Sequence, residues 1–249
     1  LTMLIVAPRS PALVARFGPD DLVIVIGDPS KRRDFLDEAI RSLWPLKESA
    51  MTAYERTLRQ RNRLLKEWEG RGAPTGLGAW DAELVKNGSA LVRLRAEAAT
   101  RLSPSAEEEY RHLAGYGLAC DYAPNVTGEP LEEAFERRLA ERRSDELIRR
   151  TTLVGPHRDD LTLAVRDLGA RSFASHGEAW AAALCLRLGL ASAVANEVRE
   201  RPVLLLDDPF SALDPRRQRL VGERLTDRGQ VLVSVADDAH VPGSSSIVL

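Results

Sequence analysis

The apolar positions at the start of the chain form three short runs separated by prolines and glycines. These runs are Leu4–Ala7, Leu13–Phe17 and Leu22–Ile26. Short apolar or β-branched runs with such boundaries are typical of strands joined by turns. After them, Ser30 is suited to cap a helix through Trp44, because apolar residues then recur on one helical face. The first part of the chain therefore predicts strands that lead into a helix.

Two long amphipathic helices are predicted next, over residues 46–69 and 79–102. Apolar side chains recur along the first at spacings of three, four and seven residues, and only Arg61 interrupts this stripe. A glycine-rich stretch separates the two helices, which favours an antiparallel helical hairpin. A third, short helix is expected over residues 103–113, starting at Ser103-Pro104.

A charged helix over Glu129–Arg150 follows a short strand at residues 117–123. Two pairs of arginines on this helix admit two interpretations. They can belong to a solvated face held by ion pairs between successive turns, or they can form a contact surface for the phosphates of DNA. The arginines are Arg137, Arg138, Arg142 and Arg143.

The C-terminal part of the chain alternates between strands and helices. Strands are predicted at Asp160–Val165, Val203–Leu206 and Gln230–Val235. Helices are predicted between them at Ser175–Asn196 and Asp214–Arg228. This order implies parallel strands connected by helices, so the sequence predicts an α/β lobe.

The composition is that of a soluble globular protein. The 249 residues are 44% hydrophobic and 29% charged, with a formal net charge of -2. Any contact with nucleic acid must therefore use a local basic face. Two cysteines cannot build a disulfide framework or a four-cysteine zinc site, which favours a reduced, cytoplasmic setting. Neither a membrane-spanning run of about 20 residues nor a signal peptide is expected.

The strand predicted at Val203–Leu206 ends in two acids, Asp207 and Asp208. In open parallel sheets, ligands gather at the carboxyl ends of the strands. An acid placed there can hold Mg²⁺ beside a triphosphate through water, and a second acid can orient and deprotonate an attacking water. In this Walker B interpretation Asp207 holds the metal and Asp208 is the catalytic residue.

Two segments nearby strengthen this interpretation. Ser211–Asp214 matches the D-loop that ABC-type ATPases place at their dimer interface. Ser175–Glu178 opens the apolar helix with small residues, whose free backbone N–H groups can bind an anion. ABC-type signature motifs use this geometry to clamp the γ-phosphate of a nucleotide held by the partner subunit.

Ser234 ends the strand that follows Walker B, a position where ABC proteins place a residue that contacts the γ-phosphate. The predicted signature residues are Ser175, His176, Gly177 and Glu178, and the D-loop residues are Ser211, Leu213 and Asp214.

The sequence resembles the RecF family, the recombination-mediator ATPases of bacteria. The segments that carry the resemblance follow the family order almost from end to end, and those around Arg61 and His157 are distinctive even alone. The segments are Phe17–Leu22, Lys31–Asp37, Leu58–Lys66, Gly155–Leu161, Ala174–Glu178 and Leu205–Asp214.

The resemblance implies an α/β fold, an ABC/SMC-like ATPase head with a helical-hairpin arm or lid. Residues 1–29 would be a remnant of the ATPase lobe that leads into the arm, residues 30–150 the arm, and residues 151–249 the lobe that carries signature, Walker B and D-loop. It also implies that ATP and Mg²⁺ are the cofactors of full-length members. His157 and Arg158 would lie near the nucleotide or the interface between heads.

The resemblance further implies an ATP-dependent homodimer that binds double-stranded DNA and gap junctions, and promotes RecA loading with RecO and RecR.

The sequence departs from the family pattern at two places that affect the predicted function. No G-x-x-x-x-G-K-[S/T] motif occurs in the 249 residues, which indicates an N-terminally truncated chain or a paralogue that has lost its nucleotide pocket. Pro209 follows the two acids, where the family has an apolar residue. Taken literally, the chain is expected to be inactive alone, and the alternative function is a non-catalytic DNA- or partner-binding module.

Overall fold

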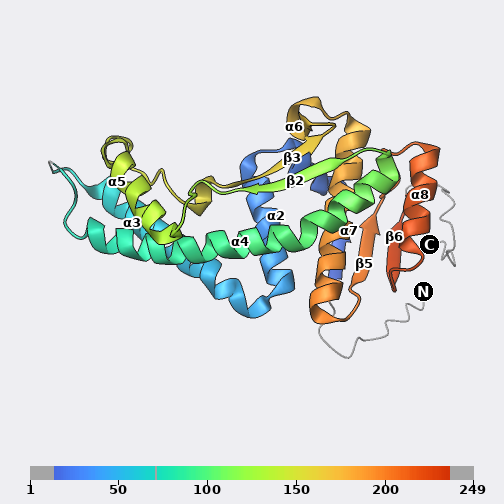
Figure 1. Cartoon of the computed structure of the whole chain (residues 1–249), viewed down its shortest axis with the longest axis horizontal. Helices are drawn as coiled ribbons and strands as arrows, with labels where there is room; N and C mark the ends of the chain where they lie inside the picture. The colour runs from blue at the N-terminus through green and yellow to red at the C-terminus, as the bar shows by residue number, and fades with distance from the viewer. Residues whose placement is uncertain (1–13, 71, 236–249) are drawn as a thin grey trace. The chain divides into compact units, whose positions relative to one another are not determined.

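The computed structural model describes residues 14–70 and 72–235. The strand predicted at Leu4–Ala7 lies outside these residues. The chain divides into two compact units (Figure 1). Unit 1 contains the described parts of residues 1–27, 101–120 and 163–249, and unit 2 contains residues 28–100 and 121–162.

The bounds of these units differ from the predicted domain bounds for two segments. Each segment makes ion pairs within the unit to which it belongs. Residues 101–120 belong to unit 1, where Glu109 binds Arg224 at 2.6 Å. Residues 151–162 belong to unit 2, where Asp160 binds Arg32 at 2.6 Å.

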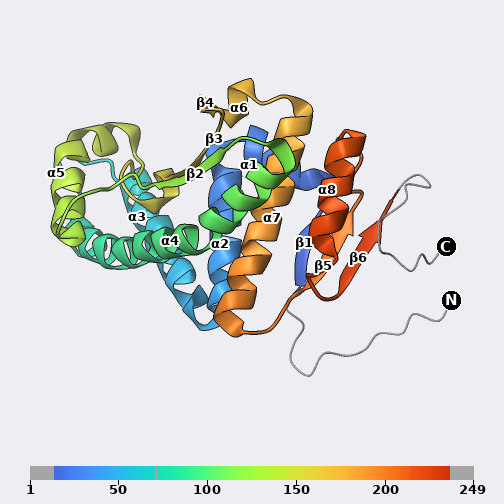
Figure 2. The same cartoon turned by 45° about the vertical axis from the view of Figure 1, so that its right-hand side comes forward.

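Unit 1 is built on a parallel three-stranded sheet in the order β1-β5-β6. The register pairs Phe17 with Leu206, and Asp207 with Ser234. Because the strands run in the same direction, their carboxyl ends meet at one edge of the sheet. Figure 2 shows these strands beside helices α7 and α8. The parallel pairing predicted from the C-terminal pattern is confirmed for the strands at Val203–Leu206 and Gln230–Val235, but the strand predicted at Asp160–Val165 lies in another sheet. The bounds are β1 Val14–Phe17, β5 Val203–Asp207 and β6 Val231–Ser234.

Helix α7 (His176–Val198) is the core helix of unit 1. It is long and apolar enough to cross a membrane, contrary to the expectation that no such run exists, but 83% of its most apolar window is buried inside the protein. Gly189 lies against the C-terminal part of helix α4 (Leu77–Ala114). A Cβ atom at Gly189 would lie 2.7 Å from the backbone nitrogen of Ala106. The glycine therefore permits a close approach of the two helix backbones.

The apolar run Leu22–Ile26, predicted as a strand, is helix α1. The prediction was wrong because five consecutive apolar residues carry no periodicity that separates helix from strand. The turn before it favours the helix, since the Gly18 N–H donates to the Asp21 carboxylate at 3.0 Å and closes a 3₁₀ turn, Pro19–Asp21.

A second sheet has the order β2-β3-β4. Strands β3 and β4 form an antiparallel hairpin that turns at Arg166 and Asp167. Both turn residues have left-handed backbones, with φ of 52° and 64°, as a two-residue type I′ turn requires. The remaining elements of this part of the fold are β2 Leu118–Ala123, β3 Asp160–Val165, β4 Leu168–Gly169, α6 Ala170–Phe173 and α8 Pro215–Leu225.

Unit 2 is mainly helical and contains α3 and the first part of α4, which form the predicted hairpin; from residue 101 on, α4 belongs to unit 1. Helix α4 continues without a break through Pro104, so the separate helix predicted over residues 103–113 is wrong. Proline inside a helix costs about 3 kcal/mol, but the buried face continues across it through Leu102, Ala106 and Tyr110. Packing of this face outweighs the missing hydrogen bond. The other elements are α2 Pro29–Leu43, α3 Glu48–Glu67, α5 Leu131–Arg149 and the 3₁₀ turns Pro45–Lys47 and Pro156–Arg158.

Arg61, which interrupts the apolar stripe of α3, is fully buried. Its guanidinium pairs with Asp81 at 2.9 Å and with Glu146 at 2.6 Å, and donates to the Thr152 hydroxyl at 2.7 Å. A fully buried charge requires such partners. The interruption of the stripe is therefore the ionic centre of unit 2.

Candidate functional site

Three strand ends of the parallel sheet bring Gly18, Asp207 and Ser234 together. The Ser234 hydroxyl donates to Asp207 Oδ1 at 2.5 Å. Gly18 is the first residue after β1. It lies so near Asp207 that a Cβ atom built at Gly18 would be 3.7 Å from the Asp207 Cβ. The Asp207 carboxylate is exposed. The structure thus places Ser234, selected by position alone, directly beside the predicted metal-binding acid.

Asp208 leaves the strand with a left-handed backbone, at φ 47°. Its N–H donates to the Ser234 carbonyl at 2.9 Å, and its own carbonyl accepts from the Ser211 hydroxyl at 3.3 Å. This conformation costs a non-glycine residue about 1 kcal/mol or more, and such strain gathers at functional sites. The chain therefore turns at Asp208, which is half-exposed and lies outside β5, whereas Asp207 is the last residue of that strand.

The predicted signature forms the N-terminus of α7, with Ser175 as its cap. The Ser175 hydroxyl accepts from the Glu178 N–H at 3.3 Å, and the Glu178 carboxylate accepts from the Ser175 N–H at 2.8 Å. Within the described part of the chain, the N–H groups of His176 and Gly177 have no hydrogen-bond partner. Free N–H groups at an exposed helix N-terminus form the geometry that binds anions.

The predicted D-loop lies against this turn and leads into α8. Asp214 caps that helix, because its Oδ1 accepts from the Arg217 N–H at 3.0 Å. Leu213 is buried, whereas Ser211 and Asp214 are exposed. A Cβ atom at Gly177 would lie 3.0 Å from the Ala212 carbonyl oxygen. Signature and D-loop are thus in contact within unit 1.

Trp180, one turn beyond the signature, connects it to the strand ends. Its indole N–H donates to the Pro209 carbonyl at 3.0 Å, and its ring meets the Phe17 ring edge-on at 5.4 Å. Pro209 therefore keeps an ordered role through its carbonyl group, although it departs from the family pattern. Trp180 was not predicted as a linking residue, although its place one turn after Gly177 on an apolar helix was an available signal.

The Glu178 carboxylate is strongly held in its ionised form. Burial would raise its pKa, but hydrogen bonds from the Tyr116 hydroxyl and from Ser175, together with the charge of Arg166, lower the pKa to about 2. Tyr116 and Arg166 were not predicted from the sequence. A carboxylate held in this way fixes the N-terminal turn of α7.

His157 and Arg158 have a different environment, in unit 2. The Thr152 carbonyl can only accept, so His157 Nε2 donates to it at 3.0 Å, and Nδ1 accepts from the Tyr54 hydroxyl at 2.7 Å. Burial, opposed by the bond to Thr152, lowers the pKa of His157 to about 4. Arg158 is exposed. The contacts of His157 give it a structural role, and proximity to a nucleotide stays a prediction.

The four arginines of α5 that were considered for DNA contact all have acidic partners. The pairs along the helix are exposed or half-exposed, as in a solvated helix face, and DNA contact stays a prediction. The partners are Glu133 for Arg137, Glu141 for Arg138, Asp145 for Arg142 and Asp81 for Arg143.

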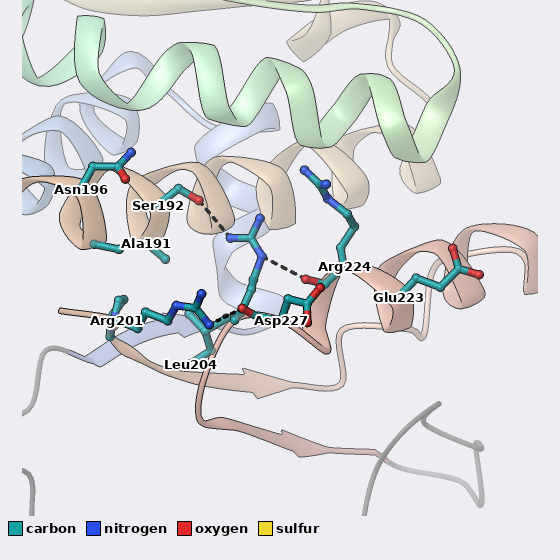
Figure 3. Close-up of a pocket in the computed structure, with 11 residues that line it drawn as sticks. Ala191, Ser192, Asn196, Arg201, Leu204, Glu223, Arg224 and Asp227 are labelled. Atoms are coloured by element: carbon teal, nitrogen blue, oxygen red, sulfur yellow. Dashed lines mark hydrogen bonds between the residues drawn. The ribbon is translucent and has the colours of Figure 1, made fainter. Parts of the chain in front are cut away.

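A cavity of about 340 Å³ lies elsewhere in unit 1, between α7, α8 and the start of β5 (Figure 3). Two arginines in its wall, Arg224 and Arg228, already bind the buried Glu109. None of the predicted site residues lines it. Over residues 14–70 and 72–235, no group of three or more His, Cys, Asp or Glu side chains could hold a metal ion. The predicted site is therefore the exposed edge of the sheet and not an enclosed pocket.

Comparison with known proteins shows close similarity to one group of bacterial proteins, although no family model matches the sequence. The DNA replication and repair protein RecF of Streptomyces avermitilis is 40% identical over 255 residues, which cover 96% of this chain and 68% of that protein. The RecF proteins of Cutibacterium acnes and Frankia alni are each 38% identical, covering 91% of this chain and 64% of each relative. The chain thus spans about two thirds of the length of these relatives.

Two solved structures have the same fold. A structure of the recombination mediator protein RecF-ATP in the RecFOR pathway matches with a TM-score of 0.80 and 28% identity. A structure of RecF-ATPrS in the same pathway matches with a TM-score of 0.81 and 27% identity. The RecF-ATP match covers 90% of this chain and 62% of that protein's chain. The RecF-ATPrS match covers 92% of this chain and 63% of that protein's chain. The expected α/β, RecF-like fold is confirmed.

Proposed function

Because the chain belongs to the RecF family of DNA replication and repair proteins, we propose that it supplies the signature, Walker B and D-loop parts of an ATP-dependent DNA-binding protein. In its complete form this protein forms a homodimer around two nucleotides and binds double-stranded DNA at gaps in the bacterial cytoplasm. With RecO and RecR it promotes the loading of RecA. The similarity to a structure of RecF-ATP in the RecFOR pathway supports the proposed use of ATP and the proposed partners RecO and RecR.

The observation that carries the proposal is the convergence of strand ends and helix N-terminus in unit 1. The Asp207 carboxylate, the Ser234 hydroxyl and the strained Asp208 backbone lie at one edge of a parallel sheet. The predicted signature turn, whose His176 and Gly177 N–H groups have no partner among the described residues, contacts the predicted D-loop. Carboxylates beside a phosphate-binding turn suit the hydrolysis of a triphosphate.

The residues divide the chemistry between two subunits. Asp207 would hold Mg²⁺ through water; one exposed carboxylate suffices, since Mg²⁺ keeps several waters in such sites. Bound there, the metal would neutralise phosphate charge. Asp208 would orient the attacking water and accept its proton. Ser175 and Gly177 would clamp the γ-phosphate of the nucleotide on the partner, and Asp214 would link the two sites.

A second candidate function is a non-catalytic DNA- or partner-binding module. The observation that favours it is the absence of a G-x-x-x-x-G-K-[S/T] motif from the 249 residues. Without the nest of N–H groups and the lysine of that loop, little remains to hold the β- and γ-phosphates.

Complementation between two inactive variants tests the first candidate. The test protein is this chain preceded by the P-loop lobe of the Streptomyces avermitilis relative, called here the extended chain. Ser175→Arg places bulk and charge at the helix N-terminus that would face another subunit's phosphate. This variant is expected to bind ATP as a monomer but not to dimerise with it. Mixed with a variant that lacks the P-loop lysine, it should recover partial ATP hydrolysis, because one composite site is intact.

Ser172→Arg is the matched control, since Ser172 is exposed and precedes the signature. It should leave dimerisation and hydrolysis unchanged. If Ser175→Arg abolishes nucleotide binding by the monomer, the helix serves its own pocket and the assignment in trans is wrong. An extended chain that binds no ATP would favour the non-catalytic module.

A further inference from the structure

Tyr116 lies between the two elements that the proposed function assigns to the partner's nucleotide. It follows α4, and its hydroxyl donates to Glu178 Oε1 at 2.6 Å. The same hydroxyl accepts from Arg217 Nη2 at 3.4 Å. Glu178 belongs to the signature turn, and Arg217 lies in the first turn of α8, directly after the D-loop. One hydroxyl group therefore contacts both elements.

The Tyr116 ring is held in place from two directions. The buried Tyr110 ring meets it edge-on, with centroids 5.9 Å apart. The Arg166 guanidinium lies over its face, 4.9 Å from the centroid, and also pairs with Glu178. Arg166 comes from the left-handed β3–β4 turn, whose backbone fixes the direction of this side chain. The hydroxyl position is thus set by packing, as a positioning group requires.

Each partner of Tyr116 in turn holds a residue of the predicted site. Glu178 accepts from the Ser175 N–H at 2.8 Å. The Arg217 N–H donates to Asp214 at 3.0 Å, and the Arg217 Nε lies 3.5 Å from the other Asp214 oxygen. A continuous series of contacts therefore runs from Ser175 through Tyr116 to Asp214.

We propose that Tyr116 is a positioning residue, which sets the distance between the signature turn and the D-loop so that both engage the partner's nucleotide together. The inference rests on the proposed function. Tyr116 itself touches no nucleotide in this scheme. Its loss should leave ATP binding intact and slow the hydrolysis that depends on alignment of the two elements.

Tyr116→Phe in the extended chain tests this role, because it removes only the hydroxyl. We expect kcat for ATP hydrolysis to fall about tenfold with little change in KM, the effect of one lost hydrogen bond to a charged group. Tyr122→Phe is the matched control, since Tyr122 also donates to a buried carboxylate, that of Asp159 in unit 2. It should leave kcat unchanged. Equal kcat in Tyr116→Phe and the parent, or an equal loss in both variants, would overturn the proposal.

Amide hydrogen exchange on the 249-residue chain gives a readout that needs no nucleotide. Tyr116→Phe should speed exchange at the N–H groups of both Ser175 and Arg217, whereas exchange at Leu204 in the parallel sheet should not change. NMR titration should also show a higher Glu178 pKa, because a donor to its ionised form is lost. Unchanged exchange at both sites would overturn the proposal. If the extended chain hydrolyses no ATP, the proposed function fails, and the exchange result still decides whether Tyr116 links the two elements.

Discussion

The Arg61 guanidinium lies 2.6 Å from the Glu146 carboxylate, and neither side chain is exposed to solvent. Asp81 binds a second edge of the same guanidinium, and the Thr152 hydroxyl accepts a third bond. The partners come from α4, from α5 and from the segment that follows α5. This buried cluster therefore joins three helices of unit 2.

Loss of the Arg61 charge should strongly destabilise the protein, because the buried Glu146 carboxylate would lose its cationic partner, whereas Asp81 keeps Arg143. Arg61→Met is expected to lower the free energy of unfolding by about 3–5 kcal/mol. Arg63→Met is the control, since Arg63 forms an exposed ion pair with Glu67 and its loss should cost less than about 1 kcal/mol. Urea denaturation followed by circular dichroism measures both. If both variants lose a similar free energy of unfolding, the buried Arg61 cluster stabilises the protein no more than an exposed ion pair does.

Mild acid should destabilise the protein through His157. Its pKa is about 4 when folded, below the ordinary value of 6.5, so protons bind the unfolded chain more readily. Stability from the neutral ring is present above pH 6.5 and is lost as the pH falls toward 4. Between pH 7 and pH 5 the loss should be about 2 kcal/mol.

His157→Gln is expected to flatten this part of the stability profile, because glutamine does not titrate. His112→Gln, at an exposed histidine, should leave the slope as it is. Unfolding measured by urea at several pH values gives both slopes. An unchanged slope in His157→Gln would mean that other groups cause the acid sensitivity.

The 249-residue chain is expected to bind ATP weakly or not at all. The proposed Walker B acids would offer only a metal-mediated contact, since no G-x-x-x-x-G-K-[S/T] motif occurs among the 249 residues. Isothermal titration calorimetry with Mg-ATP checks this. A micromolar dissociation constant would contradict it and would indicate a phosphate site made by other residues.

Asp208→Asn in the extended chain should trap ATP-bound dimers and slow hydrolysis strongly. Asparagine removes the proposed base but tolerates the left-handed backbone at φ 47°, so the fold should persist. Metal binding by Asp207 should remain. Size-exclusion chromatography with ATP and a phosphate-release assay measure the two effects, with Asp227→Asn, at an exposed acid, as the control. Equal turnover in Asp208→Asn and the parent would assign water activation to another group.

The sequence predicted strands β5 and β6 and helix α7 well, because their patterns are strong and local, but it did not show that Asp160–Val165 joins a second sheet. Strands β5 and β6 and the Ser175 cap lie within one or two residues of their predicted places. Helix α1 was misassigned for lack of periodicity. The break predicted before Pro104 did not occur, because packing of a continuous buried face outweighed the local signal.

The contacts that organise the site could not be predicted, because their partners are distant in sequence. Tyr116 and Glu178 are 62 residues apart, and Tyr116 and Arg217 are 101 apart. No local pattern marks Tyr116 or Arg166 as partners of the signature. The left-handed backbone at Asp208 also has no clear sequence signal, since glycine is the residue that most often adopts this conformation, although aspartate tolerates it.

The contact at Gly189 has an evolutionary consequence. At most buried positions of α7, a change of side-chain volume can be compensated by a neighbour of complementary volume. At Gly189 the obstacle is the backbone nitrogen of Ala106, which no substitution removes. Lineages in which α4 and α7 stay in this contact are therefore expected to retain glycine here. A side chain at this position in a relative would indicate that its two helices had first moved apart.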